Sequence, residues 1–328
     1  MQQDNTNARA REIATPRIAR ERVGLVVSGV DAQAAVADIV AADTAGVQQI
    51  WMTQSTPTPD TLTIFAAAAV QTHTVRLGTA IIPTYPRHPL ALAQQVLALN
   101  DLTPNRIRLG IGPSHRPVIE GVYGIPLTKP MEHTREYVDI LRALLWNGKI
   151  DHTGTFYTIK SNFPRTTRTP ILISALREGA YELAGEVADG AISWVSPVPY
   201  LLNKALPALH MGAVKSQRPV PPLIAHIPVA LSEDRQAVVS AARKQIGRYG
   251  RLPFYASMFA EAGFPVSSDG TMSDDLIDSL AVSGNEANVT ARLTELLASG
   301  LDEILVMSIA VTDPAAEQTR LAQLVGRL

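Results

Sequence analysis

Short apolar runs of β type alternate with alanine-rich helical segments along nearly the whole chain, and this alternation limits the possible folds more than any other feature. Eight runs are expected as strands, at residues 23–28, 49–53, 75–82, 106–112, 170–175, 190–196, 223–231 and 303–309. Strands that alternate with helices form parallel sheets covered by helices. The pattern therefore predicts an α/β protein whose strands close into a (β/α)8 TIM barrel, and an open, doubly wound sheet is the alternative.

The length of the chain, 328 residues, fits one barrel domain with insertions, since such barrels need about 250 residues. We expect a flexible N-terminal arm over residues 1–21 and a single barrel domain over residues 22–328. Insertions are expected near residues 113–130, 147–165 and 250–284. The arm has no apolar core of the signal-peptide type, and apolar runs elsewhere are too short to span a bilayer, so we expect a cytoplasmic protein.

Composition and charge exclude several classes of function. The chain has no cysteine, which removes disulfides, thiolate zinc sites and iron–sulfur clusters. Its 7 histidines are scattered, without a pair at helical ligand spacing, so we expect no metal site. A net charge of −1 gives no electrostatic basis for binding nucleic acid or an anionic membrane. A small molecule is therefore the expected partner.

The candidate site residues follow the expected strands, because active sites of TIM barrels lie on the loops after the strands. The fourth strand runs into Gly110-Ile111-Gly112-Pro113-Ser114-His115. This segment has only part of a dinucleotide fingerprint, so it indicates either a tight strand exit or the close approach of a flat cofactor. The segment Ala175–Ala180 follows the fifth strand and begins a helix, where free N–H groups attract a phosphate. An ordinary turn with a solvated Arg177–Glu178 pair is the alternative there.

Two motifs give the chain a recognisable resemblance. The segments Leu77–Pro89 (LGTAIIPTYPRHP) and Arg108–His115 (RLGIGPSH) resemble the luciferase-like oxidoreductases, in particular the branch that uses the deazaflavin coenzyme F420. The similarity continues through Pro170–Trp194 and covers nearly the whole chain. It implies a (β/α)8 barrel, commonly a homodimer, with the cofactor ring across the C-terminal mouth of the barrel.

The resemblance also assigns residues to the cofactor by position. It implies a β-bulge with a non-prolyl cis peptide at Ala80–Ile81 behind the ring, the loop Gly112–His115 beside the ring, and a phosphate site at Ala175–Ala180. For Trp51 and Trp194, which belong to this set, the alternative is that they only pack against neighbouring side chains. The expected cofactor-binding residues are Trp51, Thr53, Thr79, Ala80, Ile81, Gly112, Pro113, Ser114, His115, Ala175, Leu176, Arg177, Glu178, Gly179, Ala180 and Trp194.

Three residues are the candidates for chemistry. His115 is the first candidate for proton transfer, because imidazole titrates near neutral pH; a role in orienting the loop or the cofactor is the alternative. Thr53 and Gln54 are expected to form hydrogen bonds with ring or substrate oxygens. Many F420-dependent relatives end the second strand with an Asp-His pair, whereas this chain has Thr53, Gln54 and Ser55. No carboxylate at this position can therefore serve as acid or base. His226, within the seventh strand, is expected to be a core residue.

The resulting prediction is an F420-dependent oxidoreductase that transfers a hydride to or from a small organic substrate, with the cofactor providing the hydride chemistry. Two alternatives stay open. One is a monooxygenase of the same fold that depends on flavin mononucleotide (FMN). The other is a non-catalytic flavin-binding protein, to which the missing Asp-His pair lends support.

Overall fold

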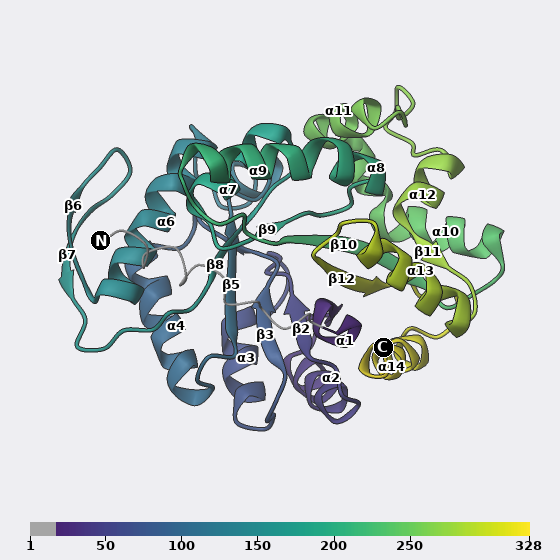
Figure 1. Ribbon diagram of the computed structural model, residues 1–328, viewed down its shortest axis with the longest axis horizontal. Helices are drawn as coiled ribbons and strands as arrows, with labels where there is room; N and C mark the ends of the chain where they lie inside the picture. The colour runs from purple at the N-terminus through teal and green to yellow at the C-terminus, as the bar shows by residue number, and fades with distance from the viewer. Residues whose placement is uncertain (1–17) are drawn as a thin grey trace, which may run out of the picture.

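The computed structural model describes residues 18–328, and its main sheet is a closed parallel barrel (Figure 1). The last barrel strand pairs with the first, Val23 lying opposite Ile304. This confirms the predicted TIM barrel. The eight strands around it are β1 (Val23–Val26), β2 (Gln49–Met52), β3 (Arg76–Thr79), β5 (Ile107–Gly112), β8 (Ile171–Ser174), β9 (Ala191–Ile192), β10 (Leu223–Ala230) and β12 (Glu303–Ser308).

Two very short strands extend this sheet. β4 (Ile82–Pro83) continues the course of β3 after two residues and pairs with β5. β11 (Val282–Ser283) pairs with the end of β10. The residues between β3 and β4 therefore form an interruption at the C-terminal end of the third barrel strand.

Helices cover the outside of the barrel, and several begin at a side-chain cap. Asp31 accepts a hydrogen bond from the backbone of Ala34, and His88 accepts one from Leu90, which satisfies N–H groups that have no partner within the helix. The covering helices are α2 (Ala32–Thr44), α3 (Thr61–Ala69), α4 (Pro89–Leu102), α6 (Pro130–Asn147), α7 (Glu178–Val187), α8 (Val198–Tyr200), the π-helical turn η1 (Leu201–Ala205), α9 (Leu206–Lys215), α10 (Arg235–Ile246), α13 (Glu286–Ala298) and α14 (Pro314–Gly326). None of the helices between residues 18 and 328 is long and apolar enough to cross a membrane.

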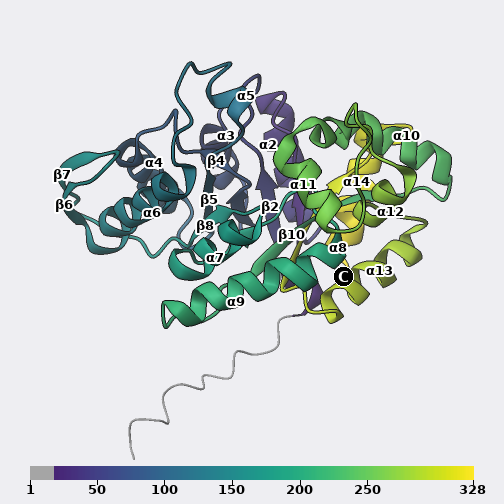
Figure 2. The same ribbon diagram turned by 90° about the horizontal axis from the view of Figure 1, so that it is seen from above.

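Additional elements lie where the three insertions were expected. α5 (Arg116–Ile119) follows β5, and the antiparallel hairpin of β6 (Lys149–Thr153) and β7 (Thr158–Asn162) follows α6. The hairpin lies beside α6 at one side of the molecule, with α10 to α13 at the opposite side (Figure 2). The third set is η2 (Gly247–Arg251), α11 (Pro253–Glu261) and α12 (Asp274–Leu280).

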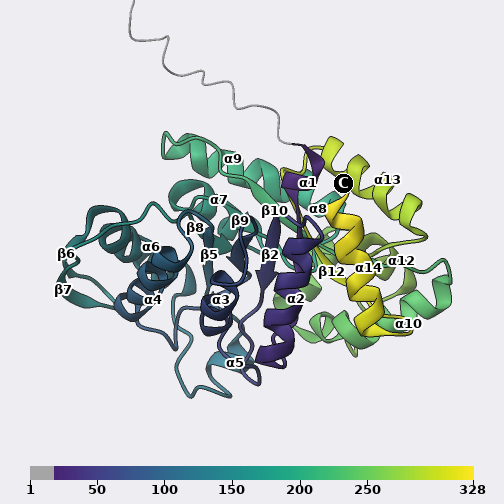
Figure 3. The same cartoon turned by 90° about the horizontal axis from the view of Figure 1, so that it is seen from below.

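The N-terminal end of the barrel is closed by α1 (Ala19–Arg22). Residues 1–17 of the expected arm lie outside the described residues. Arg22, the first residue of the expected barrel domain, donates hydrogen bonds to the carbonyls of Leu301 and Asp302, at 2.6 and 2.8 Å. The Glu21 carbonyl also accepts a bond from Gln49 at 2.7 Å. Residues 19–21 therefore belong to the barrel, and Figure 3 shows α1 and α5 at opposite ends of its strands.

A buried polar group occupies the N-terminal end of the barrel interior. Arg108 and Glu303 form an ion pair at 2.5 Å, with side chains 9% and 2% exposed. Gln49 accepts a further hydrogen bond from Arg108 at 2.6 Å. The Arg108 guanidinium thus faces the Glu303 carboxylate and the Gln49 side-chain oxygen. Because both charges have partners, the group avoids most of the cost of burying an isolated charge. The C-terminal end is left for the candidate site.

Candidate active site

The interruption between β3 and β4 forms one edge of the barrel mouth. The Ala80–Ile81 peptide bond is cis, which confirms the geometry that the resemblance implied. Ala80 donates its backbone N–H to the carbonyl of Met52 at 2.8 Å, and the Ile81 carbonyl accepts from the backbone of Gln54 at 3.4 Å. A Cβ atom on Gly112 would lie 3.4 Å from the Ile81 side chain. Ile81, which is half-buried, and Gly112, which is buried, are therefore neighbours at the mouth.

Thr79 has a structural role rather than the expected contact with the cofactor. Its side chain is fully buried; its hydroxyl donates to the carbonyl of Gly110 at 2.7 Å and accepts from the N–H of Gly110 at 2.8 Å. Both hydrogen bonds fix β3 against β5. Because its hydroxyl hydrogen is used and the residue is shielded from the mouth, Thr79 cannot bind a ring placed there.

Trp51 is likewise a packing residue, so the expected cofactor contact is corrected. Its side chain is 1% exposed and lies inside the barrel between two glycines of neighbouring strands. Cβ atoms on Gly24 and Gly78 would lie 2.5 and 2.4 Å from atoms of the indole ring. The Arg108 guanidinium lies 5.0 Å from the ring centroid on the N-terminal side. The glycines thus make room for an indole that fills the barrel below the mouth.

The loop Gly112–His115 forms the side of the mouth next to Ile81. Gly112 is required here by space, because a Cβ atom would lie 2.1 Å from the Ser174 hydroxyl. Ser114 has a φ of 60°, in the left-handed region, and reverses the chain before His115 starts α5. Pro113, Ser114 and His115 are all half-buried. The sharp turn brings His115 back toward the mouth rather than into solvent.

Two tyrosines of the third insertion surround His115. The ring centroids of Tyr249 and Tyr255 lie 6.2 and 5.8 Å from that of His115. Burial, together with the charge of Arg248, lowers the pKa of His115 below its ordinary value of 6.5. The imidazole is therefore neutral at pH 7. A neutral imidazole has one nitrogen that donates and one that accepts, so it can hold or take up a proton.

Trp194, which follows β9, forms another part of the wall of the mouth. Its indole stacks on His226 with a centroid separation of 3.8 Å, and its Nε1 donates to the Tyr249 hydroxyl at 2.8 Å. His226 is fully buried, as expected of a core residue, and its Nδ1 accepts from the backbone of Val195. Burial lowers the pKa of His226 to about 3, so it is uncharged. These contacts hold the half-buried Trp194 in one orientation at the mouth.

The start of α7 offers an open helix N-terminus beside the mouth. A Cβ atom on Gly179 would meet no atom within 4 Å, and the first N–H groups of a helix have no acceptor within it. Arg177, the N-cap residue, pairs with Glu261 of α11, while Glu178 pairs with Lys204 at 3.6 Å. The solvated Arg177–Glu178 pair is therefore not formed. Small residues, open space and free N–H groups fit a phosphate of a cofactor.

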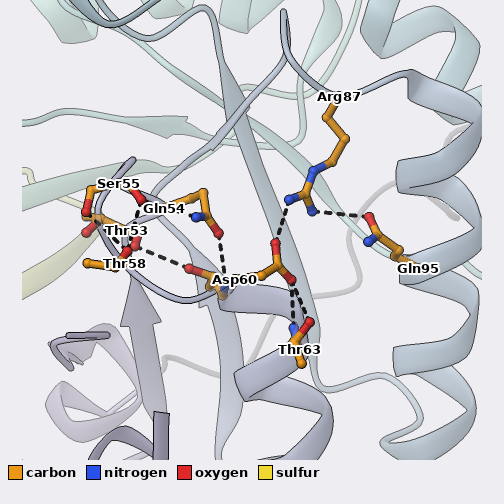
Figure 4. A network of polar contacts seen from close by, with 9 residues as sticks. Thr53, Gln54, Ser55, Thr58, Asp60, Thr63, Arg87 and Gln95 are labelled. Carbon is orange, nitrogen blue, oxygen red and sulfur yellow. Dashed lines mark hydrogen bonds and ion pairs between the residues drawn. The ribbon is translucent and has the colours of Figure 1, made fainter. Parts of the chain in front are cut away.

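Thr53 and Gln54 lie in the loop after β2, in a polar network that Figure 4 shows. The Gln54 side-chain oxygen accepts from the backbone of Thr61 at 2.8 Å, and the Thr61 hydroxyl donates to the Thr53 carbonyl at 3.2 Å. The Gln54 side-chain oxygen is thus committed to the start of α3. Its amide nitrogen makes only a long bond, 3.3 Å, to the carbonyl of Ser55. Within residues 18–328 the Thr53 hydroxyl makes no hydrogen bond, so both groups remain available as donors.

Sequence reasoning missed an ion pair between Asp60 and Arg87, called the clasp below, that joins two loops of the mouth. Asp60 caps α3 by accepting from the Thr63 N–H at 2.9 Å, and its other oxygen binds Arg87 at 2.5 Å (Figure 4). Arg87 also donates to Gln95 of α4 at 3.1 Å. Burial raises the pKa of Asp60, but the bonds from Arg87 and Thr63 outweigh it and lower the pKa overall. The cap pattern of Asp60 was visible in the sequence, whereas its partner was not.

Arg248 and Tyr249 were also missed, because nothing in the sequence pattern connects η2 with the loop Gly112–His115. Both residues belong to the third of the expected insertions. Its Tyr255 is buried against His115, while Phe254 is 67% exposed. Within residues 18–328 no group of three or more His, Cys, Asp or Glu side chains is arranged to hold a metal ion. The described residues thus offer no metal site, and the titratable groups next to the loop Gly112–His115 are His115, Tyr249, Tyr255 and Arg248.

Comparison with known proteins places this chain in a family. Residues 17–303 match the family described as luciferase-like monooxygenase, and the chain belongs to this family. The 5,10-methylenetetrahydromethanopterin reductase of Methanolobus tindarius is 25% identical over 288 residues, covering 81% of this chain and 87% of that protein. An F420-dependent glucose-6-phosphate dehydrogenase of Beutenbergia cavernae is 32% identical over 194 residues, covering 57% of each chain.

Solved structures agree with the fold. An F420-dependent secondary alcohol dehydrogenase in complex with an F420-acetone adduct has a TM-score of 0.79 at 17% sequence identity, with 92% of this chain and 97% of that chain covered. At this level of identity the likeness concerns the barrel and the order of its elements. Membership of the family thus rests on the sequence match, and the architecture rests on both.

Proposed function

We propose that this protein is an oxidoreductase that uses F420 to transfer a hydride to or from a small organic substrate at the barrel mouth. The observation that carries this proposal is the open start of α7 at Gly179, beside a mouth lined by Ile81 and Trp194. An anion-binding helix start next to an apolar slot suits a flat ring on a phosphate-bearing tail. Relatives whose names state F420 dependence support the choice of cofactor.

Each part of the mouth has a distinct task in this proposal. When bound, F420 would accept or donate two electrons as a hydride at a ring carbon. The residues Ala175–Ala180 would hold its phosphate, and Ile81 and Trp194 would exclude water from the ring. Gly112–Ser114 would line its edge, with the missing side chain of Gly112 leaving room for Ser174 behind the loop. The Thr53 hydroxyl and the Gln54 amide nitrogen would donate hydrogen bonds to ring or substrate oxygens.

His115 is the proposed group for proton transfer. Its imidazole is uncharged at pH 7 and makes no hydrogen bond within the described residues, so a substrate heteroatom can reach it. In the direction that reduces the substrate, a proton must reach the atom that gains charge as the hydride arrives. Neutral His115 can donate a hydrogen bond to that atom, which takes its proton from water; in the direction that oxidises the substrate, the free ring nitrogen of His115 can accept the proton that the substrate loses.

Titration of the purified protein with F420 tests the cofactor, and stopped-flow measurement of the oxidation of reduced F420, followed as the return of the absorbance of the oxidised deazaflavin, tests the reaction. We expect F420 to bind and at least one member of a panel of enones, imines and quinones to oxidise its reduced form. Tight binding of reduced FMN with no binding of F420 would contradict the proposal and favour the FMN-dependent monooxygenase, which the description of the family supports. F420 binding without turnover of the whole panel would favour the non-catalytic flavin-binding protein.

We also propose that the protein is a homodimer, as the resemblance implies. A groove between α2 and α3 is lined mainly by small and apolar side chains, which permit close packing of helices from a second copy. Light scattering after size exclusion tests this, and a monomer at tens of micromolar would contradict it. The residues that line the groove are Ala32, Gln33, Val36, Ala37, Val40, Ala41, Pro59, Asp60, Thr63, Ile64, Ala67 and Gln71.

A further inference from the structure

Arg248 brings a positive charge to the mouth that no carboxylate neutralises within residues 18–328. One of its terminal nitrogens lies 3.4 Å from the Tyr249 hydroxyl oxygen, and its guanidinium carbon lies 5.1 Å from the centroid of the Tyr249 ring. The same hydroxyl oxygen accepts from Trp194 at 2.8 Å. The guanidinium is thus held over an aromatic ring that is itself fixed to the wall of the mouth.

Neighbouring arginines are arranged differently. Arg177 pairs with Glu261, and Arg243 pairs with Asp274 and also donates to a backbone carbonyl. These charges hold helices together and are neutralised where they lie. Arg248 is exposed and within residues 18–328 has only an aromatic ring and a phenol oxygen as partners, so most of the five donors of its guanidinium face solvent and are free for a ligand. A planar donor group of this kind matches an oxyanion.

Two further donors lie next to Arg248. The Tyr249 hydroxyl oxygen accepts two N–H groups, from Trp194 and Arg248, and within residues 18–328 its own hydrogen has no acceptor. Tyr249 is only 7% exposed, so this donor is largely shielded from bulk water. The His115 ring lies 6.2 Å away, between centroids, and carries a further N–H. A buried donor without an acceptor is costly, and an oxyanion at this place would satisfy it.

We propose that Arg248 and Tyr249 bind an oxyanion carried by the substrate, a carboxylate or a phosphate, so that the enzyme acts on anionic rather than neutral compounds. This inference rests on the proposed function, since it places the anionic group beside the ring of F420. The phosphate of the cofactor has its own place at the start of α7, on a different strand end. The oxyanion therefore belongs to the second ligand, the substrate.

Binding of a flat carboxylate and its neutral amide tests the proposal. Benzoate and benzamide are titrated calorimetrically into the full-length protein, with and without saturating F420, and F420 affinity is measured separately by fluorescence. We expect benzoate to bind at least about tenfold more tightly than benzamide, the effect of one charge-assisted hydrogen bond. Arg248→Gln should abolish this preference and change F420 affinity less than about twofold. Arg251→Gln, at an exposed arginine of the same helical turn, is the matched control and should keep the preference.

Every outcome bears on the proposal. Equal binding of the two compounds to the wild-type protein, or of neither, would overturn it, as would a preference that Arg248→Gln preserves. A loss of F420 affinity in Arg248→Gln that matches the loss of benzoate affinity would assign the arginine to the cofactor. If the wild-type protein fails to bind F420, the proposed function fails; a benzoate preference that depends on Arg248 in the titration without cofactor would then still establish the oxyanion site.

Discussion

Replacement of Gly78 by alanine should destabilise the barrel through Trp51 and not through the backbone. The new Cβ atom would lie 2.4 Å from the indole ring, about 1 Å short of ordinary contact. The indole is 1% exposed and enclosed on its other side by Gly24, so it has little room to move. Overpacking of this kind costs about 1–3 kcal/mol. Gly78 lies in a strand with negative φ, which alanine adopts without strain.

A double-mutant cycle isolates the cause. Trp51→Ala alone should cost about 3–5 kcal/mol, because it empties the barrel interior. In that background Gly78→Ala should cost little, since the space it needs is free, so the two changes should couple by about 1–3 kcal/mol. Urea unfolding followed by circular dichroism measures all four proteins. An equal cost of Gly78→Ala in both backgrounds would refute the reasoning and show that the glycine is needed by the strand itself.

Three other predictions concern charged and titratable groups. Glu303→Gln should lower the free energy of unfolding by about 3–5 kcal/mol, because it leaves Arg108 charged and buried. Asp60→Asn keeps the cap of α3 but removes the charge that faces Arg87; it should cost under about 1 kcal/mol at pH 7. Because the pKa of Asp60 is lowered on folding, this difference should vanish as pH falls below 3.8. His115→Ala should lower turnover more than F420 affinity, and wild-type turnover should fall as pH drops below 6.5 and the imidazole is protonated.

Each of these has a control and a contrary result. Glu120→Gln breaks the exposed pair with Arg116 and should change stability by under about 1 kcal/mol; a similar loss at Glu303 would mean that burial does not set the cost. A difference between Asp60→Asn and wild type that persists in acid would exclude the charge as its cause. Equal losses of turnover and F420 affinity in His115→Ala would make His115 a binding residue.

Periodicity and end signals predicted most of the fold. The fourth strand was predicted to within one residue, over residues 106–112, and β5 spans Ile107–Gly112. The sixth strand was predicted too long, over residues 190–196, whereas β9 ends at Ile192. After Ile192 the chain turns: Val195 has a φ of 48°, and its N–H bonds to the His226 side chain instead of a strand. Local sequence carries no sign of that long-range contact.

The site residues that lie directly at strand ends could be predicted from the sequence. Residues whose role depends on their depth inside the barrel, or on contacts between distant segments, could not. His115, Gly112 and the start of α7 follow directly from the position of strand exits. For Trp51, alternation along β2 shows that the indole faces inward but not how far below the mouth it lies. Tyr249 reaches His115 only through the tertiary fold.

The clasp between Asp60 and Arg87 has a consequence for how the mouth can change. It ties the loop after β2, which carries Thr53 and Gln54, to the loop that follows β4. Arg248 and Tyr249 come instead from the insertion after α10, which hydrogen-bonds to the wall through Trp194. The loops after β2 and β4 are thus joined, so a substitution that displaces one of them would displace the other as well. The other side is joined to Trp194 through Tyr249 and to Arg177 through Glu261, so a change in this insertion would also reach the wall of the mouth and the start of α7.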